Sequence, residues 1–235
     1  MKDSGKNAVI ILARNLEAGK VKTRLAKTLG NDFALQFYKL CSEKIFEESK
    51  KLIAEDITVH LFYAGEQTDR QLIDRAGFPF SIYRQQGDNL GSRMKNAFNK
   101  IFNENAAKAI IIGTDVPDLD SGFIIDAFNM LDTNDAVIGP AADGGYYLLG
   151  LKRPFDVLFD KIAWSTGSVF NNTVMKMRKS KIKYRIMPEL NDIDTVEDLM
   201  RWLSADNLRA ENSFKIKIRR MLDNLNINNA VDRAD

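Results

Sequence analysis

The chain has 235 residues, of which 45% are hydrophobic and 28% are charged, and this composition excludes a disordered or collagen-like protein. A chain of this length forms one large domain or two small ones and buries roughly 70% or more of its unfolded surface. Its 34 basic and 32 acidic residues leave a net charge of +2, too little for a protein that binds nucleic acid mainly through its phosphates. We therefore expect any charge-driven binding to be local.

Cysteine and histidine are too scarce for several kinds of site. Cys41 and His60 are the single residues of their types, which excludes an intramolecular disulfide and a His-rich zinc site and favours metals with oxygen ligands. We expect both side chains to be packed in the core. The apolar run 8–13 ends at Arg14 and is shorter than a signal-peptide core, and no stretch approaches the roughly 20 apolar residues of a membrane span. These features predict a cytoplasmic protein without a membrane partner.

Apolar runs alternate with segments of helical periodicity along most of the chain. The run 9–12 has no polar alternation, which is typical of a strand buried on both faces. Repeated strand–helix units predict a mainly parallel sheet with helices on both faces. The predicted strands are 9–12, 57–63, 79–84, 109–113, 136–139, 146–151 and 184–187, and the predicted helices are 33–53, 69–76, 92–105, 121–131, 169–179 and one capped by Thr195.

The chain shows no repeat and no linker that would divide it, so we predict a single domain over residues 1–225. Apolar residues from Phe214 to Leu225 form one helical stripe, which predicts a C-terminal helix, about residues 206–225, docked on the core. The polar residues 226–235 are expected to form a flexible tail.

Several nucleotide-binding and hydrolase motifs are missing. Gly19 and Lys20 suggest a P-loop, but Arg14 stands where that motif needs its first glycine and Val21 follows the lysine. There is no G-x-G-x-x-G after the first strand and no G-x-S-x-G, which disfavours a dinucleotide oxidoreductase and a serine hydrolase.

A basic segment, residues 14–27, follows the first strand and holds five bases and one acid. In open α/β sheets ligands bind beyond the carboxyl ends of the strands, and several cationic donors at that edge fit a polyphosphate. The alternative is a solvated surface loop. We select Arg14, Lys22 and Arg24 as phosphate-binding candidates. Since exposed charges contribute little to stability, we expect removal of Lys22 or Arg24 to weaken binding and spare the fold.

Carboxylates follow two of the predicted strands. Asp115 and Asp118 come after the strand 109–113 and suit Mg²⁺ or Mn²⁺, although an Asp-Pro turn that caps the next helix is the alternative, which we expect for Asp120. Asp192 and Asp194 follow the last strand and have no explanation as helix caps. If the two strands are neighbours, Asp194 pairs with Asp115 across one metal.

Glycines, an acid and aromatic residues follow the strand 136–139. The glycines allow a ligand to approach the backbone closely, and the aromatic residues can stack on it. The alternative explanations are a tight hairpin turn for the loop and a buried core position for the tryptophan. The loop 85–93 carries little signal of its own, yet it supplies two further nucleotide-binding candidates. The basic run 176–185 is interpreted as a solvated helix end and edge strand. The candidates from these loops are Asp143, Gly144, Gly145, Tyr146 and Trp164 for substrate and Gly91 and Arg93 for nucleotide.

Four motifs occur in order along the chain: VKTRLA at 21–26, GTDVPDL at 113–119, DGGYYLLGL at 143–151 and WST at 164–166. With DIDTVEDL at 192–199, they resemble the GT-A superfamily and, within it, a largely uncharacterised bacterial family named for nucleotide-diphospho-sugar transferases. The likeness extends over residues 7–203. That family is also similar to the guanylyltransferases that activate phospholactate or molybdopterin.

The resemblance implies a single-domain GT-A fold, a Rossmann-like three-layer α/β sandwich with a mainly parallel sheet. It implies that Asp115 is the metal aspartate, Asp194 the second metal carboxylate, and Lys22 and Arg24 part of the phosphate-binding loop. Two features depart from the pattern. Residues 14–18 replace the Gly-rich opening of the nucleotidyltransferases, and residues 115–118 are not the Asp-x-Asp of standard glycosyltransferases.

We therefore predict a transferase dependent on Mg²⁺ or Mn²⁺ that uses a nucleotide-sugar donor and a small-molecule acceptor, with Asp115 and Asp143 as catalytic residues. The missing Gly-rich phosphate cradle favours glycosyl transfer. Nucleotidyl transfer from a nucleoside triphosphate to a phosphorylated acceptor, and a nucleotide-binding module without catalysis, remain alternatives. The sequence leaves the base, the sugar, the acceptor and the oligomeric state open.

Overall fold

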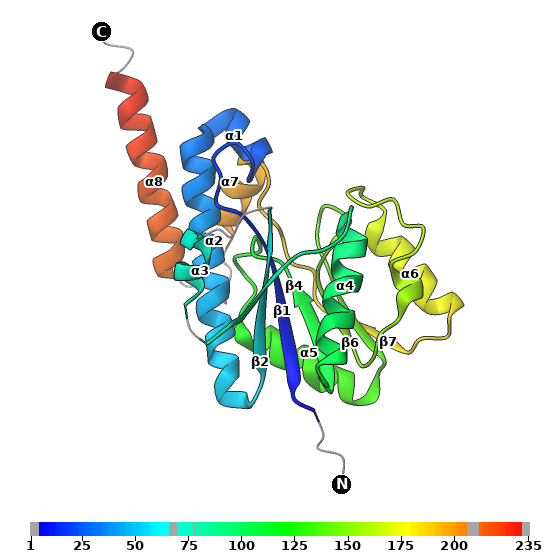
Figure 1. Ribbon diagram of the computed structural model, residues 1–235. Helices are drawn as coiled ribbons and strands as arrows, with labels where there is room; N and C mark the ends of the chain where they lie inside the picture. Colours follow the sequence, from blue (N-terminus) through cyan, green and yellow to red (C-terminus); the bar gives the residue numbers. More distant parts are fainter. Residues whose placement is uncertain (1–4, 66–69, 78, 206–211, 232–235) are drawn as a thin grey trace.

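A computed structural model describes residues 5–65, 70–77, 79–205 and 212–231, with side chains as far as residue 225. In these residues one sheet has the strand order β3-β2-β1-β4-β6-β5-β7 (Figure 1). Strand β6 runs antiparallel to β4 and β5, and the other pairs are parallel, so the predicted mainly parallel sheet is confirmed. The strands are β1 Asn7–Arg14, β2 Thr58–Ala64, β3 Ser81–Arg84, β4 Lys108–Ile112, β5 Ala136–Pro140, β6 Tyr146–Leu151 and β7 Tyr184–Ile186.

Helices cover both faces of the sheet and complete the predicted three layers (Figure 1). Helices α2, α3 and α5 pack on one face, and α4 and α6 pack on the other. None of the described helices is both long and apolar enough to cross a membrane. The helices are α1 Thr23–Leu29, α2 Asn31–Lys51, α3 Arg70–Ala76, α4 Leu90–Asn103, α5 Ser121–Thr133, α6 Val169–Lys179, α7 Val196–Ser204 and α8 Asn212–Val231, with short 3-10 helices at Leu52–Glu55 and Asp156–Leu158.

Alternate residues of the central strands supply the two faces of the core. In β1, Val9 and Ile11 contact the layer of α2 and α5, whereas Ala8 and Ile10 contact the layer of α4 and α6. This alternation is the expected geometry of a strand, and it explains why β1 is apolar throughout. Cys41 and His60 are buried, as predicted, and burial raises the pKa of the Cys41 thiol to about 12.

A third apolar cluster joins α1, α2, α7 and α8 beside the sheet. Leu25 of α1 belongs to it, which explains why part of the expected basic loop is helical from Thr23. Helix α8 contributes Phe214 and Ile218 and continues to Val231, beyond the end near residue 225 that the sequence suggested. The expected start of this helix at 206 and the last part of the expected tail, residues 232–235, lie outside the described residues.

Tyr38 fixes the carboxyl ends of the two central strands. Its hydroxyl accepts a hydrogen bond from the Arg14 backbone N–H at 2.8 Å and lies 2.8 Å from the Thr114 hydroxyl. Arg14 ends β1 and Thr114 follows β4, so one buried phenol from α2 holds together the two loops that begin there.

Two predicted helix caps are present. The Thr195 hydroxyl accepts from the Asp198 backbone N–H, while the Asp198 carboxylate accepts from the Thr195 N–H, which forms a capping box at the start of α7. Asp120 caps α5 by accepting from the Phe123 N–H. These caps orient the helices that follow β4 and β7.

Asp118 does not reach the ligand edge, contrary to expectation. It is buried, and its Oδ1 accepts a hydrogen bond from Trp202 Nε1 at 2.9 Å, which ties the loop after β4 to α7. A buried indole N–H needs such an acceptor, because an unsatisfied donor in the interior is costly.

We predict that Asp118→Ala lowers the free energy of unfolding by about 1–3 kcal/mol, because the Trp202 N–H is left without this partner. Urea denaturation measures the change. In a Trp202→Phe background the same substitution should cost clearly less, and an equal cost in both backgrounds would show that the hydrogen bond is not the cause.

Candidate functional site

The Lys22 ammonium stands between two carboxylates at the carboxyl edge of the sheet. Its Nζ lies 3.2 Å from Asp115 Oδ2 and 2.8 Å from Asp194 Oδ1. Lys22 immediately precedes α1, Asp115 follows β4, and Asp194 lies just before α7. Three loops distant in sequence therefore meet at one charged group, and Asp115 and Asp194 share a site.

The burial of Lys22 corrects the expectation of an exposed loop charge. Its side chain is 3% exposed, whereas the side chains of Asp115 and Asp194 are 41% and 35% exposed. The ammonium thus reaches the carboxylates from the protein side, and the carboxylates remain open to solvent. Arg24, by contrast, is exposed as expected, with one guanidinium nitrogen 4.0 Å from Asp194 Oδ2.

The backbone of Lys22 is also unusual. It adopts the left-handed conformation, with φ 46° and ψ 45°, at the N-cap of α1. A residue other than glycine in this region is uncommon and persists only where its surroundings hold it. Here the carbonyl of Lys22 accepts the Ala26 N–H at 2.9 Å, and its side chain is fixed by the ion pairs.

Electrostatics favour the charged forms of Lys22 and Asp115. Burial disfavours the Lys22 ammonium, but Asp115 and Asp194 outweigh burial and raise its pKa above the usual value. Burial likewise disfavours the charged form of Asp115, and the neighbouring Lys22 and Arg14 hold the pKa of that carboxyl below its ordinary range. Arg14, at the end of β1, thus acts on the same site.

Asp192 adds a further acidic group that our selection of candidates omitted. Burial, together with the negative charges of Asp143, Asp194 and Asp115, raises its pKa to about 6. A bridge between Ala141 and Leu190 brings the loop after β5 beside the loop that leads to α7. The sequence did hold a signal for Asp192, since helix capping leaves it unexplained.

A pH dependence of stability follows from the raised pKa of Asp192. The folded state holds this proton more tightly than the unfolded chain, whose aspartates titrate near about 4, so the group costs stability as pH rises from about 4 through about 6. We predict that Asp192→Asn raises the Tm at about pH 7.5 and leaves it nearly unchanged at about pH 4.

Thermal unfolding across this pH range measures the effect. Asp126→Asn, which neutralises an exposed carboxylate on α5, is the control and should not change the shape of the profile. A Tm of Asp192→Asn that falls relative to wild type at about pH 7.5 would contradict the assignment.

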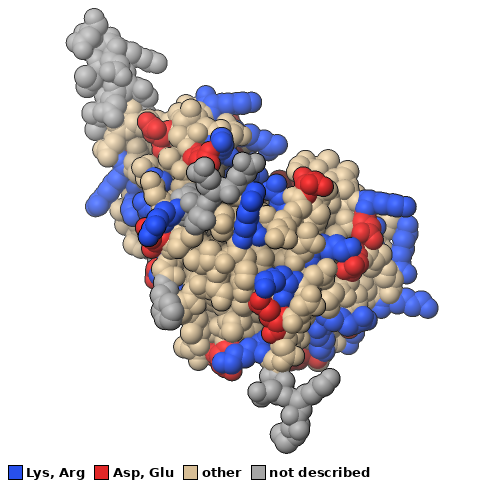
Figure 2. Space-filling view, viewed as in Figure 1, with Lys and Arg blue, Asp and Glu red and all other residues tan. Residues whose placement is uncertain are grey.

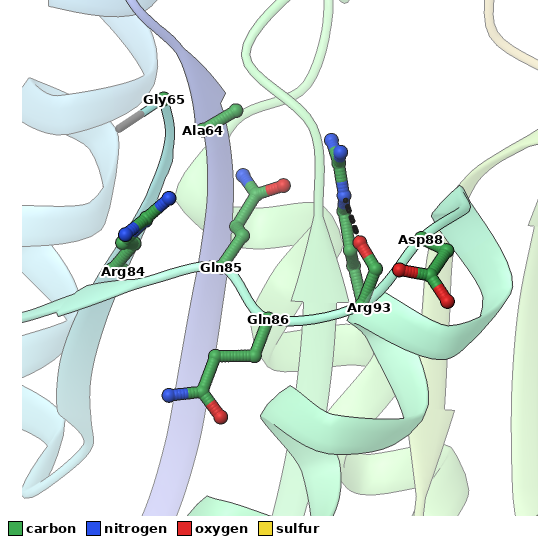
Figure 3. Close-up of a pocket in the computed structure, with 8 residues that line it drawn as sticks. Ala64, Gly65, Arg84, Gln85, Gln86, Asp88 and Arg93 are labelled. Carbon is green, nitrogen blue, oxygen red and sulfur yellow. Dashed lines mark hydrogen bonds between the residues drawn. The ribbon is translucent and has the colours of Figure 1, made fainter. Parts of the chain in front are cut away.

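A polar cavity of about 490 Å³ opens beside this site, at the carboxyl ends of β2 and β3 (Figure 3). The amide of Gln85 donates to the carbonyls of Ala13 and Phe62, at 2.9 Å and 2.8 Å, and so closes the ends of β1 and β2. Arg93 lines the cavity, and its Nε donates to the Gly87 carbonyl at 3.0 Å. The lining residues are Ala64, Gly65, Arg84, Gln85, Gln86, Gly87, Asp88 and Arg93.

Two glycine candidates, Gly91 for the nucleotide and Gly144 for the substrate, lie against other parts of the protein. Gly91 does not line this cavity; it packs against the Trp164 indole, which a Cβ at residue 91 would overlap. Gly144, at φ 85°, approaches the carbonyl of Gly167, so its small size serves packing within the protein instead of contact with a ligand.

Tyr146 is half-buried. Its ring packs against the core layer of α4 and α6, its hydroxyl donates to Met94 Sδ at 3.7 Å, and burial raises its pKa. Asp143 is exposed, and its Oδ1 accepts the Gly145 N–H at 2.7 Å in the turn before β6. The Asp143 carboxylate is therefore open to a ligand.

We predict that Gly91→Ala destabilises the protein by about 1–3 kcal/mol, because the added methyl overlaps the Trp164 ring. Thermal or urea unfolding gives the change. Trp164→Ala removes the obstacle, so in that background Gly91→Ala should be nearly neutral. A full penalty in both backgrounds would mean that glycine is needed for another reason.

The fit of a divalent metal can be judged from the same geometry. No group of three or more His, Cys, Asp or Glu side chains is arranged to hold a metal within the part of the chain that the structure describes. Asp115 and Asp194 nevertheless converge on the Lys22 ammonium, and both carboxylates stay open to solvent. Two carboxylates that leave room for substrate phosphates match the way proteins bind Mg²⁺, so the residues present fit such an ion.

Charge is distributed unevenly over the outer surface. Figure 2 shows acidic and basic side chains interspersed on one face, with basic ones gathered toward the side of α6. The basic run 176–185 occupies the end of α6 and the edge strand β7, as expected. Charged residues on an edge strand discourage pairing with another chain, which accounts for this run without a ligand.

Comparison with known proteins identifies relatives of this chain. Residues 49–166 match the family DUF2064, described as an uncharacterised protein conserved in bacteria. A crystal structure from Desulfovibrio desulfuricans G20, provisionally named a nucleotide-diphospho-sugar transferase, is 32% identical, with a TM-score of 0.84 over 94% of this chain and 96% of that one. No curated protein sequence matches significantly.

More distant structures share the fold alone. The 4-diphosphocytidyl-2C-methyl-D-erythritol synthase of Anaerococcus prevotii DSM 20548 is 10% identical, with a TM-score of 0.56 over 85% of this chain and 95% of that one. A CMP:2-keto-3-deoxy-manno-octonic acid synthetase complexed with CTP is 11% identical, with a TM-score of 0.53 over 84% and 97%. The predicted fold class and the suspected family are thereby confirmed.

Proposed function

This chain belongs to the bacterial DUF2064 family, and we propose that it is a metal-dependent transferase that uses a nucleotide-diphospho-sugar as donor. One observation carries the proposal: the carboxylates of Asp115 and Asp194 converge on the Lys22 ammonium at the carboxyl edge of the sheet. Open α/β sheets bind their ligands at this edge. The name of the 32% identical relative, which extends over nearly the whole chain, supports the same class of donor.

The basic residues around the site bind the donor diphosphate. Arg14, at the end of β1, and Arg24, in the first turn of α1, provide guanidinium groups, and Lys22 provides an ammonium between them in sequence. Guanidinium forks suit phosphate oxygens because they donate two parallel hydrogen bonds. The cavity beside β2 and β3, which Arg93 lines, accommodates the nucleoside part of the donor.

The acidic residues orient the reacting groups. Asp115 and Asp194 would hold Mg²⁺ or Mn²⁺, and the ion would supply positive charge to balance the leaving diphosphate. Asp143 keeps Oδ1 on the Gly145 N–H, which leaves Oδ2 to accept the proton of the acceptor hydroxyl. The acceptor is a small molecule bound beside the turn before β6.

Nucleotidyl transfer is a second candidate, because the pairing of Asp194 with Asp115 favours it specifically. The resemblance implies a second carboxylate on the metal for the nucleotidyltransferase branch. In this chain the two carboxylates lie close enough to contact the same Lys22 ammonium. In that reaction a nucleoside triphosphate is the donor and pyrophosphate leaves, whereas glycosyl transfer releases a nucleoside diphosphate.

A thermal-shift panel of nucleotide sugars, nucleoside diphosphates and nucleoside triphosphates, each with Mg²⁺ or Mn²⁺, tests the proposal. A ligand at about 100 times its Kd stabilises the protein by roughly 2.7 kcal/mol, so binding is visible as a rise in Tm. We expect nucleotide sugars to produce the largest rise in Tm. We expect Asp115→Asn or excess chelator to abolish the part of this rise that depends on the metal. Asp126→Asn, which neutralises an exposed carboxylate on α5, is the matched control.

The product then separates the reactions. Release of a nucleoside diphosphate across a panel of acceptors supports glycosyl transfer. Stabilisation by triphosphates alone, with pyrophosphate released on adding a phosphorylated acceptor, supports nucleotidyl transfer instead. Tight nucleotide binding with no turnover would favour a binding module.

A further inference from the structure

Lys22 places a positive charge where the metal of the proposed function must bind. Its Nζ is within 3.2 Å of Asp115 Oδ2 and 2.8 Å of Asp194 Oδ1, so it already neutralises part of this carboxylate pair. The side chain is almost fully buried, which means that the ammonium belongs to the structure and is not a mobile surface charge.

We propose that Lys22 and the divalent cation compete for the Asp115–Asp194 pair, so that the metal binds tightly only when a nucleotide phosphate draws the ammonium away. The inference rests on the proposed function, since it takes the metal site and the diphosphate from it. Lys22 is then an internal counterion that couples the binding of metal to the binding of donor.

Charge repulsion is the first reason for competition. A divalent cation on the same two carboxylates would lie within a few ångströms of the ammonium, and charges of like sign repel strongly at that separation in a partly buried site. Arg24, 4.0 Å from Asp194 Oδ2, adds a second positive charge on the solvent side. The carboxylate pair is therefore well supplied with cations before any metal arrives.

The second reason is that the Lys22 side chain can leave the carboxylate pair while the backbone stays in place. Its left-handed backbone is held by the surroundings, and the ion pairs are part of that restraint. A lysine side chain has four flexible carbon atoms and three donors, so the ammonium can turn to a phosphate without movement of α1. A diphosphate next to the site offers such a partner with a higher charge than either aspartate.

Thermodynamic linkage then fixes the consequences. If the phosphate removes a competitor of the metal, the donor must raise the metal affinity, and the metal must raise the donor affinity by the same factor. The apparent metal affinity of the free protein equals the intrinsic affinity multiplied by the fraction of molecules in which Lys22 has left the pair.

The experiment measures Mn²⁺ binding to the whole chain, from the electron paramagnetic resonance signal of free Mn²⁺, without any nucleotide. Lys22→Met, which keeps the length and apolar stem of the side chain, should bind Mn²⁺ about 5- to 150-fold more tightly than wild type, the usual range of such couplings. Asp115→Asn added to Lys22→Met should remove this gain. Arg24→Met is the matched control, because it removes the neighbouring exposed positive charge and leaves the ion pairs of Lys22 with both carboxylates in place.

Three results would overturn the inference while the proposed metal site stands, and a fourth would overturn both. Equal affinity in wild type and Lys22→Met would show that the metal uses other carboxylate oxygens with Lys22 in place. Weaker binding by the variant would show that Lys22 organises the site for the metal. An equal gain in Arg24→Met would indicate a general charge effect. A gain that survives Asp115→Asn would place the metal elsewhere.

A different result would show that the proposed function itself is wrong. If wild type and variants all bind no Mn²⁺, even with inorganic pyrophosphate present, then the metal site itself is wrong and the inference falls with it. Lys22→Asn is the second variant should Lys22→Met fail to fold, because asparagine tolerates the left-handed backbone at this position. It should show the same direction of change.

Discussion

The ion pair of Lys22 with Asp115 and Asp194 determines how the loops at the carboxyl edge of the sheet are arranged. It joins the segment before α1, the loop after β4 and the loop before α7, whose residues are 93 and 172 positions from Lys22 in the chain. A buried ammonium is tolerated only when such partners compensate it, and removal of one partner leaves an uncompensated charge. The buried position of Lys22 and the convergence of the two carboxylates therefore depend on each other.

Much of this arrangement was predictable from sequence because strand ends are easily located. Uninterrupted apolar runs marked β1 and β4, and in a parallel sheet the residues just after them must share an edge, which brought Arg14 and Asp115 together. The antiparallel direction of β6 was less evident, since an apolar run carries no direction. The short connection between β5 and β6 was the available signal, because parallel neighbours need a long crossover.

The remaining features depend on contacts that local patterns do not encode. Lys22 belongs to a charge run that resembles a solvated loop, and only its distant partners show that it is buried. Tyr38 has the spacing of a core residue of α2, although its hydroxyl secures Arg14 and Thr114. Glycines are equally ambiguous. Residue 144 must be small because the backbone of Gly167 approaches it, and the sequence alone does not distinguish a ligand from a neighbouring backbone.

The balance of charge at this edge is the physical reason for the metal in the proposed function. Asp115, Asp143, Asp192 and Asp194 act on one another electrostatically, and their mutual repulsion is evident in the raised pKa of Asp192. Lys22 offsets two of these carboxylates from the protein side, while Arg14 and Arg24 are exposed. A diphosphate that approached without a metal would add negative charge beside carboxylates that already repel one another. A divalent cation would offset that added charge, and it could bind these carboxylates only if they released the ammonium that they now hold.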